Sequence, residues 1–136
     1  MSAESEAEGL AQAERLGDPY LVYRDAEQRQ RVMSLPEGWD RVTVGRGLSA
    51  DLVLSWDEDV SRMHAELQRL GSEWALADEG LSRNGSYVNG ARIGGRRALL
   101  DGDVLRFGKT EIVFRAPFQA GEETRPATQL GEDPSS

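Results

Sequence analysis

The chain has 136 residues, and its 24 acidic against 16 basic side chains give a formal net charge of −8. This length fits one domain, and so acidic a chain is a poor general binder of the nucleic-acid backbone, which requires clustered basic side chains. Cysteine is absent and histidine occurs once, so disulfides and thiolate nucleophiles are excluded, and we expect neither a metal ion nor another cofactor. The longest apolar runs are too short to span a membrane, and no secretory signal is evident. We therefore expect a cytoplasmic protein with neither nucleic-acid nor membrane partners.

Most of the excess negative charge lies in the two ends of the chain. Residues 1–18 and 117–136 are rich in Ala, Ser, Gly, Glu and Pro and poor in aromatic residues. Such segments bury too little apolar area to offset the entropy lost on ordering them. We predict a flexible acidic tail over 1–18, in which 8–16 forms at most a marginal helix, then a folded domain over 19–116 and a second flexible acidic tail over 117–136.

Short β-forming stretches follow one another through the middle of the chain, with turn-forming residues between them. The predicted strands cover 20–24, 30–35, 41–45, 52–54, 64–70, 74–77, 86–88, 104–107 and 111–115. Short strands at this spacing favour an all-β sandwich or barrel. The side chains expected at the centre of its core are Trp74, Leu76, Leu105, Phe107, Ile112 and Phe114.

Four polar clusters lie between these strands, at residues 45–50, 61–65, 82–90 and 100–103. Each cluster taken alone is typical of an ordinary turn, and the two Asn-Gly pairs in 82–90 favour tight hairpins. Together the order is Gly-Arg, then Ser-Arg-x-His, then Ser-x-Asn-Gly-Ser-x-Val-Asn-Gly, then Leu-x-Asp-Gly-Asp-x-Leu-x-Phe-Gly. This combination resembles the forkhead-associated (FHA) domain family over residues 20–115.

The resemblance implies an eleven-stranded β-sandwich, with recognition loops at one end, that binds phosphothreonine in an extended peptide without catalysis. A phosphothreonine presents a charge of about −1.5 to −2 and three strong acceptor oxygens, which suit the planar fork of an arginine. By the resemblance, Arg46 binds the phosphate, Ser61 donates a hydroxyl to it, and Arg62 adds a second cation. Asn84 pairs with the ligand main chain, and Arg83 lies beside the phosphate.

Four further residues are expected to support this site rather than contact the ligand. The resemblance makes His64 a structural brace between the Arg46 and Ser61 loops, and it makes Asn89 part of the scaffold. No nucleophile or second base accompanies His64, so a catalytic role is disfavoured. Gly45 and Gly85 are interpreted as residues required by the backbone geometry.

The loop before Ser61 is the candidate for selecting ligand residues beyond the phosphate. Its residues Trp56, Asp57, Glu58 and Asp59 include three successive acids, which would favour Lys or Arg in a peptide that touches them. A solvated acidic loop without ligand contact is an equally good interpretation, and both stay open.

Two threonines in the C-terminal segment, Thr124 and Thr128, are candidate phosphorylation sites. A Ser/Thr kinase that phosphorylates either one would create a phosphothreonine that the same domain could bind. Thr124 lies nine residues beyond Arg115, and an extended chain of that length reaches about 30 Å. The main functional hypothesis is a phosphothreonine-reading module in Ser/Thr kinase signalling. The alternative is a phosphate-independent interaction or regulatory sandwich, part of a larger signalling protein.

Overall fold

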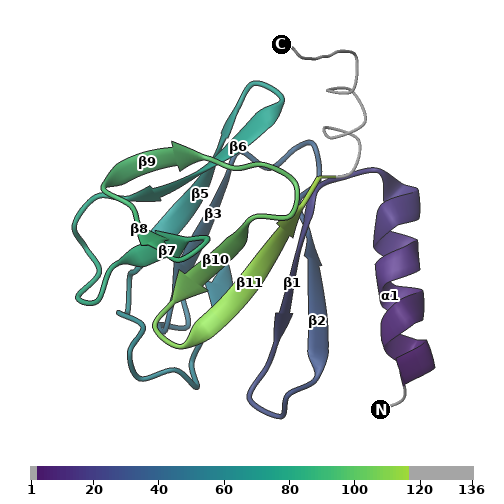
Figure 1. Cartoon of the computed structure of the whole chain (residues 1–136), viewed down its shortest axis with the longest axis horizontal. Helices are drawn as coiled ribbons and strands as arrows, with labels where there is room; N and C mark the ends of the chain where they lie inside the picture. Colours follow the sequence, from purple (N-terminus) through teal and green to yellow (C-terminus); the bar gives the residue numbers. More distant parts are fainter. Residues whose placement is uncertain (1–2, 117–136) are drawn as a thin grey trace.

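The computed structural model describes residues 3–116, which form two β-sheets packed face to face and one N-terminal helix (Figure 1). The six-stranded sheet has the order β2-β1-β11-β10-β7-β8. Its strands are antiparallel to their neighbours. In chain order they are β1 (Tyr20–Arg24), β2 (Gln30–Ser34), β7 (Ser86–Val88), β8 (Ala91–Arg92), β10 (Val104–Phe107) and β11 (Thr110–Arg115).

The five-stranded sheet has the order β4-β3-β5-β6-β9, and its β3–β4 pair is parallel. Its strands are β3 (Arg41–Gly45), β4 (Leu52–Val53), β5 (Ala65–Leu70), β6 (Glu73–Asp78) and β9 (Gly95–Ala98). The eleven-stranded all-β sandwich predicted from the sequence is thereby confirmed.

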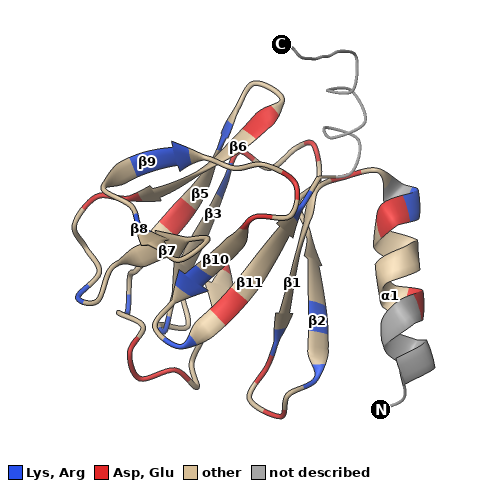
Figure 2. Cartoon of the chain, viewed as in Figure 1, with Lys and Arg blue, Asp and Glu red and all other residues tan. Residues whose placement is uncertain are grey.

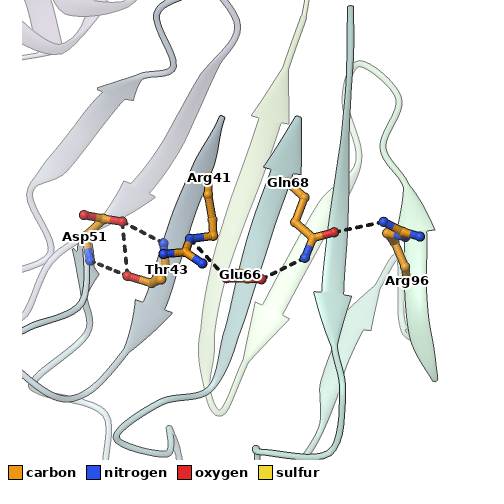
Figure 3. A network of polar contacts seen from close by, with 6 residues as sticks. All are labelled: Arg41, Thr43, Asp51, Glu66, Gln68 and Arg96. Carbon is orange, nitrogen blue, oxygen red and sulfur yellow. Dashed lines mark hydrogen bonds and ion pairs between the residues drawn. The ribbon is translucent and has the colours of Figure 1, made fainter. Parts of the chain in front are cut away.

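The core lies between the two sheets because alternate residues of each strand point inward. In β11, for example, Thr110, Ile112 and Phe114 are buried, whereas Glu111, between the first two, is exposed. All six side chains predicted for the core centre are buried. A polar network covers the outer face of the five-stranded sheet and links its strands; it joins Arg41, Thr43, Asp51, Glu66, Gln68 and Arg96 (Figure 3).

The N-terminal segment differs from the sequence-based prediction. We expected a flexible tail over 1–18 with a marginal helix at 8–16, whereas α1 spans Ala3–Leu16 and lies alongside β2 (Figure 1). Ala13 is buried, and the Tyr20 hydroxyl donates to Glu14 Oε2 at 3.4 Å. Tertiary contact therefore supports a helix that would be marginal alone. The domain boundaries at 18–19 and 116–117 stay a prediction, and the expected tail over 117–136 lies outside the described residues.

Two strands, β8 and β9, were not predicted from the sequence. Residues 95–98 read Gly-Arg-Arg-Ala and every one of them is exposed, so no alternation of apolar and polar residues marks a strand. The β9 strand forms because its main chain pairs with β6, opposite a run of buried residues that includes Leu76. Within residues 3–116, no helix has the length and apolar character needed to cross a membrane.

Candidate functional site

Three loops meet at one end of the sandwich: the first loop (46–51) follows β3, the second (54–64) precedes β5, and the third (79–85) precedes β7. The first and second are joined through their main chains, because Arg46 N donates to Ser61 O at 3.0 Å and Gly47 N to Arg62 O at 3.2 Å. The second and third are joined where Arg83 N donates to Ser61 Oγ at 2.9 Å. The sequence clusters at 45–50, 61–65 and 82–85 are therefore one site.

The Arg46 side chain is exposed and anchored at one atom. Its Nε donates to Val60 O at 3.0 Å, which fixes the direction of the guanidinium. No carboxylate among residues 3–116 pairs with it, so its two terminal nitrogens remain available as donors. A planar guanidinium held in this way can bind two oxygens of one anion.

Both ends of the first loop are fastened together on the outer face of the five-stranded sheet. Asp51 N donates to Thr43 Oγ1 at 2.9 Å, and Thr43 N and Oγ1 donate to Asp51 Oδ2 at 2.9 and 3.1 Å (Figure 3). Because Thr43 precedes the loop in β3 and Asp51 ends it, these bonds hold the Arg46 loop closed at its base.

Ser61 lies between the Arg46 loop and the third loop. Its Oγ accepts the Arg83 N–H, and its N–H donates to His64 Nδ1 at 3.0 Å. The hydroxyl hydrogen thus stays free to donate to a ligand. The side chains of Arg62 and Arg83 are exposed, and within residues 3–116 neither has a carboxylate partner.

The Asn84 side chain projects from the third loop onto the second. Its Nδ2 donates to Asp59 O at 2.8 Å, and no hydrogen-bond partner for its Oδ1 is found in the described part of the chain. The amide oxygen can therefore accept a main-chain N–H from an extended peptide.

His64 is buried beneath the site and connects two of its loops. Its Nδ1 accepts from Ser61 N, its Nε2 lies 2.8 Å from Gly85 O, and its ring meets the edge of Phe107 at 5.6 Å. A carbonyl can only accept, so these two contacts together require the neutral imidazole with its hydrogen on Nε2. This placement is that of a structural brace, but its side chain joins the second loop to the third rather than the Arg46 loop to the Ser61 loop as predicted.

The two glycines assigned to the site meet different geometric demands. A Cβ at Gly45 would lie 2.1 Å from Arg62 O, because β3 passes directly against the second loop there. Gly85 has a φ of +87°, a conformation that side chains strongly disfavour. Asn89 lies elsewhere, at the connection between β7 and β8, where it bonds Asp103 Oδ1 and Val104 N at 2.9 Å each.

The four residues 56–59 of the second loop have different surroundings. Glu58 is exposed, the Asp59 carboxylate lies 3.8 Å from Lys109 Nζ, and Trp56 stacks on Tyr23 with ring centroids 6.5 Å apart. A surface hollow of about 860 Å³ opens beside them. Asp57 fits neither of the two interpretations left open, ligand contact or a solvated acidic loop: its side chain is buried, with both carboxylate oxygens bonded internally. Figure 2 colours the acidic residues of this loop red and the arginines of β9 blue.

Asp78 is a supporting residue that the sequence reasoning missed. This buried carboxylate accepts from Ser86 Oγ at 2.7 Å, Ser82 Oγ at 2.5 Å and Gly80 N at 3.1 Å. Burial opposes its ionisation, but the Ser82 and Ser86 hydroxyls outweigh that effect and lower its pKa. The available signal was its position: an Asp at the end of a strand, followed within a few residues by Ser and Gly, is typical of a side chain that caps a turn.

The candidate phosphorylation sites Thr124 and Thr128 lie outside the described residues. Within residues 3–116, no cluster of His, Cys, Asp and Glu could hold a metal ion.

Comparison with known proteins places this geometry in a family. The FHA domain family model matches residues 42–108, which contain all three loops. The FHA domain-containing protein FhaB of Mycobacterium tuberculosis is 35% identical over 96 residues, which is 71% of this chain and 59% of that protein. The chain thus spans about three fifths of the length of this curated relative.

Two solved structures agree in both fold and sequence. One, from a structural and functional analysis of phosphothreonine-dependent FHA domain interactions, has a TM-score of 0.60 and 38% identity, covering 72% of this chain and 95% of the other. The FhaA FHA domain complexed with the intracellular domain of Rv3910 has a TM-score of 0.59 and 38% identity, covering 71% and 99%. The fold, the order of the motifs and these relatives agree: the chain belongs to the FHA domain family.

Proposed function

We propose that this chain is a non-catalytic module that binds phosphothreonine-containing proteins in Ser/Thr kinase signalling. The observation that carries the proposal is the convergence of three polar groups from three loops: the Arg46 guanidinium and the Ser61 hydroxyl as donors, and the Asn84 amide oxygen as an acceptor. The loops are bonded to one another directly, so the receptor is formed before any ligand arrives. A preformed receptor avoids the entropy cost of ordering loops on binding.

Each of these polar groups has a distinct role in the proposal. The Arg46 guanidinium and the Ser61 hydroxyl bind phosphate oxygens, and the neighbouring Arg62 and Arg83 add positive charge. Asn84 pairs with the ligand main chain, which aligns an extended peptide across the loops. A threonine methyl packed in an apolar notch would discriminate against phosphoserine by about 1–3 kcal/mol.

The test is binding of a phosphothreonine peptide selected from a degenerate library. Arg46→Ala is expected to weaken binding by about 2–5 kcal/mol, since a charge-assisted pair is lost, while the melting temperature is kept. Arg97→Ala is the matched control, because Arg97 is an exposed arginine on β9, away from the three loops. Wild-type affinity in Arg46→Ala contradicts the assignment, and unfolding of that variant shows that Arg46 is structural.

The same peptide treated with phosphatase separates this proposal from the phosphate-independent alternative. Loss of binding after treatment, together with weaker binding at higher salt, supports phosphate recognition. Equal binding before and after treatment supports an interaction sandwich that does not read phosphate.

Capture of the chain's own phosphorylated C-terminal segment is a finer part of the proposal. Thr110 bonds the second loop, whereas Ala116 N donates to Asp101 Oδ1 in the loop before β10, so β11 runs away from the site. Thr128 lies twelve residues beyond Ala116. From Ala116 an extended chain reaches about 26 Å at Thr124 and about 40 Å at Thr128, so Thr128 has the longer reach back toward the loops.

Chain phosphorylated at Thr128 should therefore bind free phosphopeptide more weakly than unmodified chain. Thr128→Ala treated with the same kinase is the control. Equal peptide affinity in the phosphorylated and unmodified chains contradicts self-capture without affecting the main proposal. The cytoplasmic location stays a prediction.

A further inference from the structure

Asp57 is a buried carboxylate in the acidic second loop. Its side chain is 5% exposed, while its neighbour Glu58 is exposed to solvent. A carboxylate is costly to bury unless its oxygens accept hydrogen bonds. The partners of Asp57 therefore indicate what it does.

Those partners lie on the opposite sheet. Asp57 Oδ2 accepts from Thr110 Oγ1 at 2.7 Å and from Lys109 N at 2.8 Å, in the turn between β10 and β11. The turn is shaped around the carboxylate: Gly108 has a φ of +61°, and a Cβ there would lie 2.7 Å from Asp57 Oδ1. The second loop belongs to the five-stranded sheet, so this contact bridges the two layers of the sandwich.

The remaining Asp57 groups fix the loop itself. Oδ1 accepts from Asp59 N at 3.0 Å, and the Asp57 carbonyl accepts from Val60 N at 3.1 Å. The Val60 N–H lies in the same planar peptide group as the Asp59 carbonyl, so these bonds set the orientation of that carbonyl directly. The Val60 carbonyl belongs to the next peptide group, whose Ser61 N–H donates to His64 Nδ1 at 3.0 Å.

The loop presents its next two carbonyls to the site. Asp59 O accepts Asn84 Nδ2 at 2.8 Å, and Val60 O accepts Arg46 Nε at 3.0 Å. The two side chains proposed to read phosphate and peptide main chain are thus both aimed by carbonyls of one short segment. A shift of the main chain at residues 59–60 would therefore displace the Asn84 and Arg46 side chains together.

We propose that Asp57 and Thr110 are positioning residues: the Thr110 hydroxyl anchors the Asp57 carboxylate, and Asp57 holds the turn 57–60, whose Asp59 and Val60 carbonyls bond Asn84 and Arg46. This inference rests on the proposed function only where it concerns phosphopeptide binding. The hydrogen bonds that orient Asn84 and Arg46 are present in the protein without a ligand. It assigns a role in recognition to Thr110, which lies on the other sheet and contacts none of the proposed ligand-binding side chains directly.

The first experiment compares Thr110→Val with Thr110→Ser. Valine keeps the shape but removes the hydroxyl, and with it the hydrogen bond that anchors the Asp57 carboxylate. We expect Thr110→Val to bind the phosphothreonine peptide about tenfold or more weakly. Thr110→Ser, which restores the hydroxyl, should bind within about twofold of wild type. Equal affinity of wild type and Thr110→Val overturns the proposal.

The second readout needs no ligand. The Arg46 Nε–H signal in an NMR spectrum reports the bond to Val60 O, so Thr110→Val should shift it and speed its exchange with water, while Thr110→Ser should not. An unchanged Arg46 signal in Thr110→Val overturns the positioning role even if wild type binds no phosphopeptide. Failure of wild type to bind phosphopeptide, with the Arg46 signal displaced in the variant, contradicts the proposed function alone.

Asp57→Asn and Asp103→Asn form a matched pair that separates positioning from general destabilisation. Asp103 is also buried, but it bonds Leu100 N and Asn89 Nδ2 away from the three loops. Asp57→Asn should displace the Arg46 signal and weaken binding, whereas Asp103→Asn should lower stability and keep both. An equal loss of affinity in the two variants overturns the inference.

Discussion

Two buried aspartates support the loops that carry the exposed site residues. Asp57 lies under the second loop and Asp78 under the third. Burial opposes ionisation of Asp57, but the Thr110 hydroxyl and the main-chain N–H groups of Lys109 and Asp59 outweigh it and lower its pKa. Since the pKa of Asp78 is lowered as well, both loops depend on ionised carboxylates.

These lowered pKa values predict how stability depends on pH. A carboxyl whose pKa is lower in the folded than in the unfolded chain stabilises the fold in full above the unfolded value of about 3.9, and this contribution is lost as the pH falls through the folded value. The unfolding free energy should therefore decrease below about pH 4, and less steeply in Asp57→Asn and Asp78→Asn. Denaturant titrations between pH 6 and pH 2 measure this, and identical slopes in wild type and both variants would contradict it.

At the scale of single residues, the motifs indicated the exposed polar residues of the loops but not the buried residues that hold those loops in place. The motif spacing placed Arg46, Ser61 and Asn84 in three loops at one end of a sandwich, and these loops contact one another in the structure. Asp57 was placed with the exposed acids, since three successive acids carry no signal that one of them turns inward. Its direction depends on Thr110, which lies fifty-three positions later in the chain.

At the scale of elements, β3 passes so close to the second loop that the position of Gly45 leaves no room for a side chain. A Cβ at Gly45 would lie 2.1 Å from Arg62 O and 2.9 Å from Arg62 C, and these are main-chain atoms that cannot swing away. Gly45→Ala should destabilise the domain by about 1–3 kcal/mol or more, since overpacking forces the backbone to shift. It should also displace Arg46 and weaken phosphopeptide binding.

The control is Gly38→Ala, because an added Cβ at Gly38 meets nothing within 4 Å. Denaturant midpoints and peptide affinities of the two variants provide the measurement. A Gly45→Ala variant as stable as Gly38→Ala would show that the two loops can separate at little cost.

Elements were predictable from the sequence where apolar alternation marked them. The β3 strand was found because Val42 and Val44, both buried, alternate with polar neighbours, whereas β9 was missed because all its residues are exposed. Helix α1 was underestimated for a related reason: its own sequence favours a helix only weakly, and its contact with β2 cannot be read from local periodicity.

At the scale of the whole molecule, the helix and the candidate site occupy different parts of the fold. The helix lies along β2 at one edge of the six-stranded sheet, whereas the three loops lie at one end of the sandwich (Figure 1). The helix covers Tyr20, which has no exposed surface and whose pKa is raised by burial. This arrangement predicts that stability and recognition respond separately to loss of the helix.

Deletion of residues 1–18 should expose Tyr20 and lower the unfolding free energy by about 1–3 kcal/mol, the usual contribution of one large buried side chain. Phosphopeptide affinity should stay within about twofold of wild type, since the helix packs against β2. Ala13→Glu, which places a charge at the buried face of α1, should reproduce the loss of stability in the intact chain. Calorimetric titration with the phosphopeptide, run beside denaturant unfolding, separates the two effects. A large loss of affinity in both variants, measured where each is still folded, would show that the helix shapes the loops through the sheet.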